Sequence, residues 1–236
     1  MEPASPPGEA VYEPPPPPPP FYEPPPPAPP DLRAPKTALW LGVRPSLFVP
    51  FGSLWIDGFQ SPSGVYYRRR TFANYAAPGP GAEFDAGARF SRRYMVFALY
   101  QHAELGTGNL DDAAFGGQER GATNFYGVGL RFSTDPAAIG FALEIALGYR
   151  DFTAYWSDGT KLSMTDGILD ARIGLGADFR LSRHFTLDPM LVLGGGSFGS
   201  RKWSGSITEG SGFASTDEAG EYGTLELQLG AHFDVY

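Results

Sequence analysis

Residues 139–150 read Ile-Gly-Phe-Ala-Leu-Glu-Ile-Ala-Leu-Gly-Tyr-Arg, a strict alternation of large apolar side chains with small or charged ones. A period of two is that of a β-strand, whose successive side chains point to opposite faces. Ile139, Leu143 and the other large apolar residues share one face, whereas Glu144 and Arg150 share the other. The segment is long enough to cross a bilayer as a tilted strand.

The same alternation recurs along the rest of the chain and predicts eight strands, at residues 38–51, 83–90, 93–103, 125–132, 139–150, 169–180, 184–198 and 225–235. The segment at 93–103 is apolar on both faces, so its orientation stays open. Pro189 interrupts the seventh segment. Because proline lacks an amide donor for the sheet, we expect a β-bulge there.

The size of the side chains indicates which face points outward. The interior of an eight-stranded barrel is just wide enough for its own side chains. Each strand carries too many large apolar residues for that space, whereas the glycines, alanines and charges of the other face fit. The sequence therefore predicts an all-β protein, an eight-stranded antiparallel up-and-down transmembrane β-barrel over residues 38–236. A soluble sandwich or lipocalin-like binder, which alternates too, is the alternative.

The expected connections alternate in length. Those after the second, fourth and sixth strands are short, and the others are longer, at about 52–80, 104–121, 153–163 and 199–220. Outer-membrane barrels alternate short periplasmic turns with long extracellular loops in this way. Aromatic residues that suit a lipid–water boundary mark the short-turn end, namely Phe90, Tyr94, Phe132, Phe179, Phe185 and Phe233.

Residues 1–37 differ in composition from the rest. Seventeen of the 24 prolines fall within residues 1–35, so we expect a disordered polyproline II segment without a core. It serves either as a semi-rigid spacer or as a ligand for a proline-recognising or envelope partner. Met1-Glu2-Pro3 opens no signal peptide. We therefore expect an export signal to precede this chain; a cytoplasmic protein is the alternative.

The barrel pattern resembles the small bacterial outer-membrane β-barrel family, the OmpA-type transmembrane domain and OmpX-like proteins. In that family the last strand carries an assembly signal, and Gln228, Gly230, Phe233 and Val235 fit its spacing, although Tyr236 lies one residue beyond it. The resemblance implies a bacterial outer-membrane location. It also implies outer-membrane lipid, lipopolysaccharide and the outer-membrane assembly machinery as partners.

The charged residues of the small-residue face should meet in the lumen. Acids and arginines are nearly balanced there, and buried charges must be paired. We expect an ion-pair network of Arg44, Asp85, Arg131, Glu144, Arg150, Asp170, Arg172 and Glu226, with Glu144 and Arg172 on adjacent strands sharing it. The network predicts a polar plug; a gated or narrow solute pore is the alternative.

The remaining features favour a structural or surface-recognition role, such as adhesion, over an enzyme. The net charge of −8 argues against nucleic-acid binding. The sequence has no cysteine, and no metal-ligand spacing or cofactor motif is evident. His102, His184 and His232 have no partner at a motif spacing, although some similar barrels modify lipid A with a His–Ser pair. Arg68, Arg69 and Arg70 form a candidate contact for lipopolysaccharide phosphates.

Overall fold

A computed structural model describes residues 32–61, 64–109, 117–134, 139–166, 169–205 and 218–235. The proline-rich residues 1–31 lie outside the described residues. The predicted polyproline II conformation of that segment and its proline-recognising partner therefore stay predictions.

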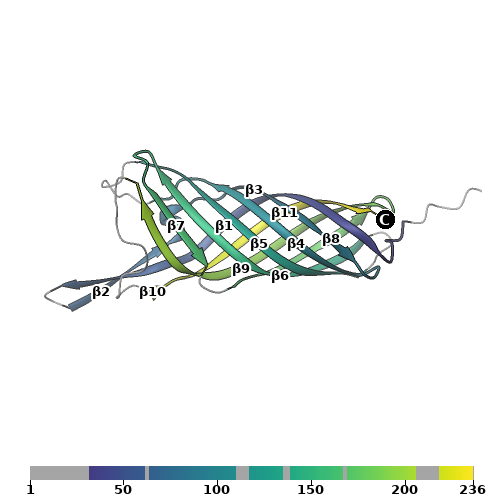
Figure 1. The fold of residues 1–236 in the computed structure, drawn as a ribbon, viewed down its shortest axis with the longest axis horizontal. Coiled ribbons are helices and arrows are strands. Elements are labelled where there is room, and N and C mark those ends of the chain that lie inside the picture. Colours follow the sequence, from purple (N-terminus) through teal and green to yellow (C-terminus); the bar gives the residue numbers. More distant parts are fainter. Residues whose placement is uncertain are drawn as a thin grey trace, which may run out of the picture. The chain divides into compact units, whose positions relative to one another are not determined.

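The described chain is almost entirely antiparallel strand (Figure 1). Its elements are β1 (Ala38–Ser61), β2 (Gly64–Thr71), α1 (Phe72–Tyr75), β3 (Gly79–Arg89), β4 (Tyr94–Leu105), β5 (Gln118–Ser133), β6 (Ile139–Trp156), β7 (Lys161–Asp166), β8 (Asp170–Arg180), β9 (Phe185–Ser204), β10 (Glu218–Ala219) and β11 (Glu221–Val235).

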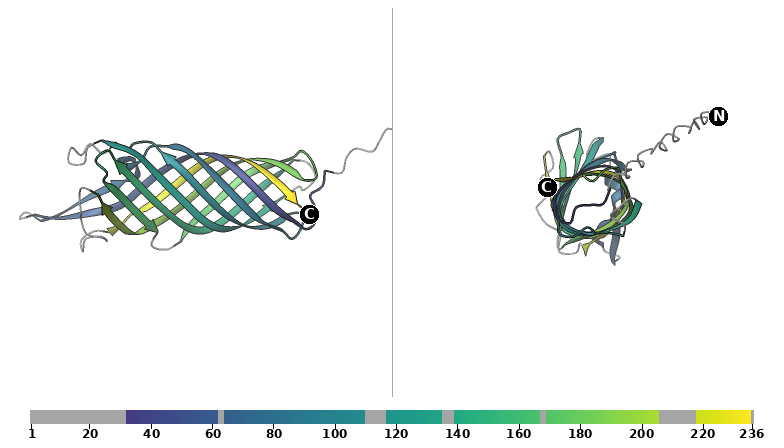
Figure 2. Two further views of the ribbon diagram at one scale, coloured as in Figure 1. Left: turned by 45° about the horizontal axis from the view of Figure 1, so that its top comes forward. Right: turned by 90° about the vertical axis from the view of Figure 1, so that its right-hand side faces the viewer.

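These strands close into a barrel. β1 pairs with β3 on one side and with β11 on the other, so the sheet has no free edge along its length. β7 and β8 both lie between β6 and β9 and act as one wall strand, as do β10 and β11, while β2 only folds back on β1. The wall therefore has the eight strands that the alternation predicted, and the end view in Figure 2 shows the closed ring.

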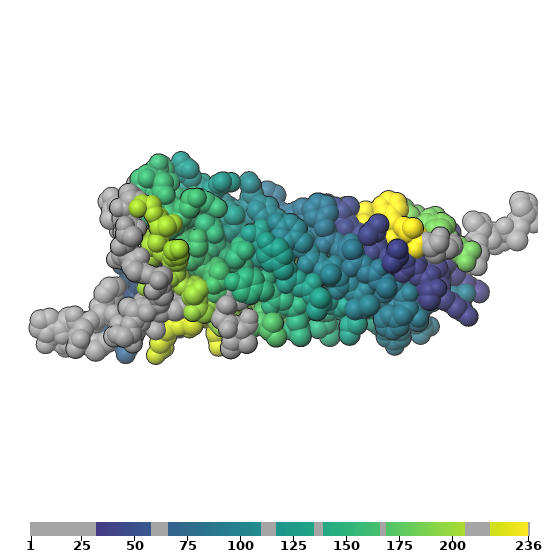
Figure 3. Space-filling model, in the orientation of Figure 1, coloured from purple at the N-terminus to yellow at the C-terminus, as the bar shows by residue number. Residues whose placement is uncertain are grey.

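The apolar face points outward, as predicted. On β6, Leu143, Ile145 and Leu147 are exposed on the outer surface, whereas Glu144 and Ala146 are buried inside. On the face drawn in Figure 3, the outer wall formed by the middle strands is continuous. Lipid is the solvent that makes such a surface favourable.

The structure shows which face of β4 points into the barrel, a choice that the sequence left open. Met95, Phe97 and Leu99 point into the barrel, and Val96 and Tyr100 point outward. The inward apolar side chains pack with Trp40 of β1 in a small internal cluster. The lumen is therefore less uniformly polar than the alternation suggests.

Several boundaries differ from the predictions. β1, β6 and β9 run well past their expected ends, and 153–163 is a tight turn at 157–160 rather than a long loop. The expected bulge at Pro189 is wrong: β9 keeps one register with both β8 and β11 across that residue. Because Pro189 has no amide to donate, the pairing of β9 with β8 is interrupted beside it. The regular pairs before and after the interruption keep the two strands in register.

Within the described residues, no helix combines the length and the apolar character that crossing a membrane requires.

Candidate functional site

Arg44 of β1 occupies the centre of the lumen and is completely buried. Its guanidinium binds Glu144 of β6 through two nitrogens, at 3.0 and 2.9 Å, and reaches Glu83 and Asp85 of β3, each at 3.2 Å. The planar guanidinium can serve several carboxylates at once, which a lysine ammonium does less well. Arg44 therefore connects opposite walls of the barrel.

Two further arginines extend this network. Arg131 of β5 binds Glu144 at 3.3 Å, Asp188 at 2.7 Å and also Asp178. Arg172 of β8 binds Glu83 at 2.8 Å and Glu226 at 3.4 Å. We call this set the ionic plug; it comprises Arg44, Glu83, Asp85, Arg131, Glu144, Arg172, Asp178, Asp188, Glu226 and His232.

Six of the eight predicted network residues are thus brought together, with partners that differ from the expectation: Arg44, Asp85, Arg131, Glu144, Arg172 and Glu226. Glu144 was expected to meet Arg172 on the adjacent wall strand. It binds Arg44 and Arg131 instead, while Arg172 turns to Glu83 and Glu226. Because Arg44 also binds Glu83, the two residues belong to one connected set.

His232 of β11 completes the ionic plug and was not predicted to take part in it. Its ring lies 3.2 Å from Asp85 and 2.8 Å from Asp188, and it accepts a hydrogen bond from Arg44 Nε at 3.1 Å. The ring also stacks on Trp40, with centroids 4.2 Å apart. In the sequence, the position of His232 on the inward face of the last strand is the signal that could have predicted this role.

Arg150 and Asp170 form a separate level of the lumen. Arg150 Nε binds Asp170, which also accepts a hydrogen bond from the Tyr222 hydroxyl at 3.1 Å. The Arg150 guanidinium lies over the rings of Phe48 and Phe125, at 5.2 and 5.0 Å from their centroids. This pair therefore marks the transition from charged to aromatic lining.

The far half of the lumen, away from the short turns, contains a cluster of buried, mainly aromatic side chains that the alternation did not predict. We call this cluster the aromatic cap; it contains Phe48, Leu54, Trp55, Phe72, Tyr75, Ala76, Ala103, Leu105, Phe152, Ala154, Trp156, Leu162, Met164, Phe198, Trp203 and Tyr222. Phe152 and Trp156 continue the inward phase of β6 beyond its predicted end. That continued phase was the signal in the sequence.

The short helix α1 provides the centre of the aromatic cap. Phe72 contacts the rings of Phe152 and Tyr222, with centroids 5.1 and 5.7 Å apart, and Tyr75 lies 5.1 Å from Trp55. Gln118 of β5 donates to the Tyr75 carbonyl and so ties the helix to the wall. A segment expected to be a loop therefore folds into the barrel mouth.

The three arginines of the predicted lipopolysaccharide contact have different surroundings in the structure. Arg68 and Arg69 are exposed on β2, which pairs with the end of β1. Arg70 instead binds Asp57 of β1 at 2.7 Å, and Arg201 of β9 reaches the same carboxylate at 3.4 Å. Arg70 thus fixes the hairpin that presents its two neighbours.

The other two histidines lie outside the lumen network. His102 faces outward on β4 and contacts the Asn124 side chain at 2.8 Å, and Asn124 in turn donates to Asp151 at 2.8 Å. His184 lies in the short turn before β9 and contacts the Asp234 carbonyl. In the described part of the chain, His, Asp and Glu side chains form no group arranged to hold a metal ion.

The predicted assembly-signal residues lie on β11. Phe233 and Val235 are about half exposed on the outer face, while Gln228 points inward and donates to Glu226 and Glu83. Gly230 packs against Asp188 so closely that a Cβ atom would overlap it. Tyr236, which follows, lies outside the described residues.

At the level of sequence, neither a protein-family model nor a curated protein matches this chain. The fold is similar to solved outer-membrane proteins. It aligns with Neisserial surface protein A at a TM-score of 0.50 and 11% identity, covering 84% of this chain and 97% of that one. It aligns with OprG from Pseudomonas aeruginosa at 0.51 and 11% identity, covering 86% and 97%.

A third structure, that of the outer-membrane protein AlkL in lipid bilayers, gives a TM-score of 0.50 at 11% identity and covers 91% of this chain and 98% of that one. The chain therefore has the fold of the small bacterial outer-membrane β-barrels, as the predicted resemblance to OmpA-type and OmpX-like barrels implied. At this identity the likeness concerns the fold alone.

Proposed function

We propose that this protein is a closed outer-membrane barrel that acts through its extracellular surface and not as a solute pore. The observation that carries this proposal is the filled lumen: the ionic plug and the aromatic cap follow one another along the barrel. Near Trp40 and Arg131, the lumen contains a cavity of about 10 Å³. A space of that size holds about one water molecule.

The outer wall supports the membrane location. Apolar side chains cover it from Leu39 to Val235, and aromatic residues gather at the end with the short turns, where Phe185 and Phe233 contact each other with centroids 4.8 Å apart. Insertion by the outer-membrane assembly machinery through Gln228, Gly230, Phe233 and Val235 is part of this proposal.

The β1–β2 hairpin is the proposed recognition surface. It extends beyond the barrel wall (Figure 1) and exposes Tyr66, Tyr67, Arg68 and Arg69. Arginine and tyrosine suit anionic, sugar-rich surfaces because they combine charge-assisted hydrogen bonds with flat apolar rings. We propose lipopolysaccharide phosphates as the ligand, and adhesion through this hairpin as the role.

Binding of the folded protein to vesicles with and without lipopolysaccharide tests this role. Arg68→Gln combined with Arg69→Gln should weaken lipopolysaccharide binding, and the loss should be smaller at high salt because exposed charges are screened. Arg92→Gln with Arg183→Gln, at the opposite end, removes the same charge and should leave binding unchanged. Equal binding by wild type and the hairpin variant would refute the proposed surface.

A further inference from the structure

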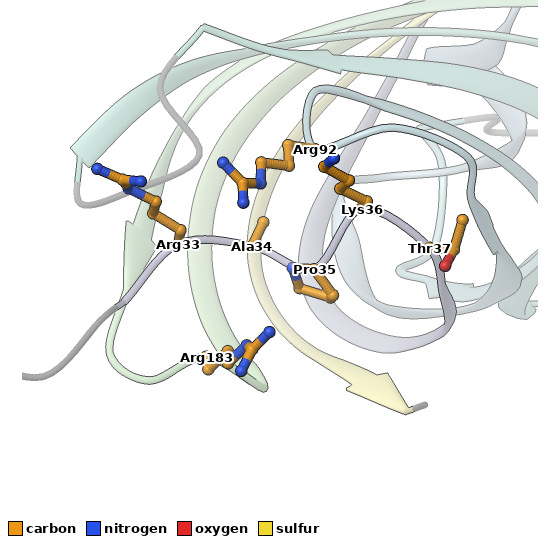
Figure 4. A pocket seen from close by; sticks show the side chains of 7 residues that line it. All are labelled: Arg33, Ala34, Pro35, Lys36, Thr37, Arg92 and Arg183. Carbon is orange, nitrogen blue, oxygen red and sulfur yellow. The ribbon is translucent and has the colours of Figure 1, made fainter.

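A cavity of about 310 Å³ lies at the end of the barrel that carries the short turns (Figure 4). It is lined by Arg33, Ala34, Pro35, Lys36, Thr37, Arg92 and Arg183. Four of these side chains are cationic, and among the described residues no carboxylate lines the cavity. The cations come from three segments of the chain: the residues before β1, the β3–β4 turn and the β8–β9 turn.

A buried clamp fixes the two turns. Asp234 of β11 binds Arg89 of β3 at 2.9 Å and Arg180 of β8 at 3.1 Å. Arg89 also donates to the carbonyl of Arg92, and Arg180 donates to the carbonyl of Arg183, each at 3.0 Å. Both arginine-bearing turns are therefore held in the same way, through two arginines that bind the same carboxylate.

The segment before β1 forms the third side of the cavity. It crosses the barrel opening in the end view of Figure 2. Ala34 and Pro35 are buried there, while Arg33 and Lys36 on either side of them are exposed. Burial of the two small residues thus holds this segment between the turns that bear Arg92 and Arg183, as Figure 4 shows.

We propose that this cavity binds a phosphate group, supplied by an anionic phospholipid headgroup of the periplasmic leaflet. A cavity lined by three arginines and a lysine favours an oxyanion that accepts more than one charge-assisted hydrogen bond. The cavity also concentrates positive charge on a protein whose net charge is −8.

The depth of the cavity favours the lipid as the source. The turn bearing Arg92 follows Phe90 and precedes Tyr94, whose outward rings stack with centroids 6.0 Å apart. The turn bearing Arg183 is followed by Phe185, which packs on Phe233. Aromatic rings of this kind lie at the membrane–water boundary, so the arginines just beyond them lie at headgroup level. This assignment of the leaflet rests on the proposed membrane orientation.

The test measures binding of two probes to the full chain folded in zwitterionic detergent. Retention of phosphatidylglycerol is counted by native mass spectrometry, and binding of inorganic phosphate is measured by calorimetry. Arg92→Gln with Arg183→Gln should weaken binding by roughly ten- to hundred-fold, the loss expected for two partly screened charge-assisted contacts. Lys161→Gln with Lys202→Gln, two exposed cations at the opposite end of the barrel, is the charge-matched control and should bind like wild type.

Tighter binding of phosphatidylglycerol than of inorganic phosphate supports the lipid as the source, and the reverse order identifies a soluble phosphate in the same site. Absence of binding by wild type, or equal binding by the turn variant, would overturn the site. If the turn variant fails to fold, Lys36→Gln takes its place in the test. This change leaves both turns intact and should also weaken binding. Loss of this site would leave lipopolysaccharide binding by the hairpin unchanged, so the two proposals fail separately.

Discussion

Arg44 joins β1 to β6 across the lumen by binding Glu144 through two nitrogens. Its inward direction follows from the alternation, because the small-residue face of every strand must share the interior. Its partners do not follow, since they depend on which walls face each other across the closed barrel. The predicted partner of Glu144, Arg172, lies on the adjacent wall strand. Glu144 instead binds Arg44 across the lumen.

The Arg44–Glu144 pair should be strongly coupled. Glu144→Gln or Arg44→Met alone leaves a buried charge without one of its partners and should destabilise the folded barrel, by at most about 3–5 kcal/mol. A double-mutant cycle in lipid vesicles should show that the two losses are far from additive. The exposed pair Glu104–Arg120, 3.6 Å apart, is the control and should couple by less than about 1 kcal/mol. Additive losses would mean that Arg44 and Glu144 do not meet.

On the outer wall, Leu143→Arg should reduce stability in a lipid-dependent way. Leu143 faces outward in the first third of β6, within the apolar outer band, where an arginine must enter the hydrocarbon and costs up to about 4 kcal/mol. Leu143→Met keeps the apolar surface and should be nearly neutral. Unfolding by denaturant in vesicles measures both changes, and equal stability of the two variants would refute the outward assignment.

At the scale of elements, the number and direction of the wall strands could be predicted, but their full length could not. The predicted segments at 38–51, 139–150 and 184–198 end before β1, β6 and β9 do. Phe152 and Trp156 show that the inward phase continues with aromatic residues. On β6 the inward face changes from small and charged to aromatic side chains after Arg150, so the alternation that predicts the strand ends before the strand does.

Helix α1 could not be predicted because its stability comes from its surroundings. Four residues are too few to form a helix in isolation, so tertiary contacts must hold it. Asn74 accepts a hydrogen bond from the Thr71 amide at 2.8 Å, and Phe72 is buried in the aromatic cap. Both contacts require the closed barrel mouth, which the local sequence does not describe.

Phe72→Ala should loosen the aromatic cap without opening the barrel. The change removes ring contacts with Phe152, Phe198 and Tyr222 and should cost about 3–5 kcal/mol of stability. Proteolysis of the folded protein should then cleave near residue 72 more quickly, because the helix loses its anchor. Tyr67→Ala, an exposed aromatic residue on the hairpin, should change neither quantity. Unchanged protection in Phe72→Ala would contradict the assigned role of α1.

At the scale of the whole molecule, the lumen has three successive kinds of contact. Asp234 and its two arginines lie nearest the short turns, the ionic plug follows, and the aromatic cap lies in the far half. The first two levels hold the walls together through charges, and the third does so through apolar packing. Opening a continuous path would require breaking buried ion pairs as well as separating packed rings, which is costly in both parts.

Conductance in planar lipid bilayers tests the closed barrel most directly. The wild-type protein should insert and show no steady conductance, because in the proposed function the ionic plug and the aromatic cap close the lumen together. Glu144→Gln combined with Phe72→Ala weakens both and should produce brief openings, whereas either change alone should leave the membrane current near baseline. A large and stable conductance of the wild-type protein would contradict the account and establish a pore instead.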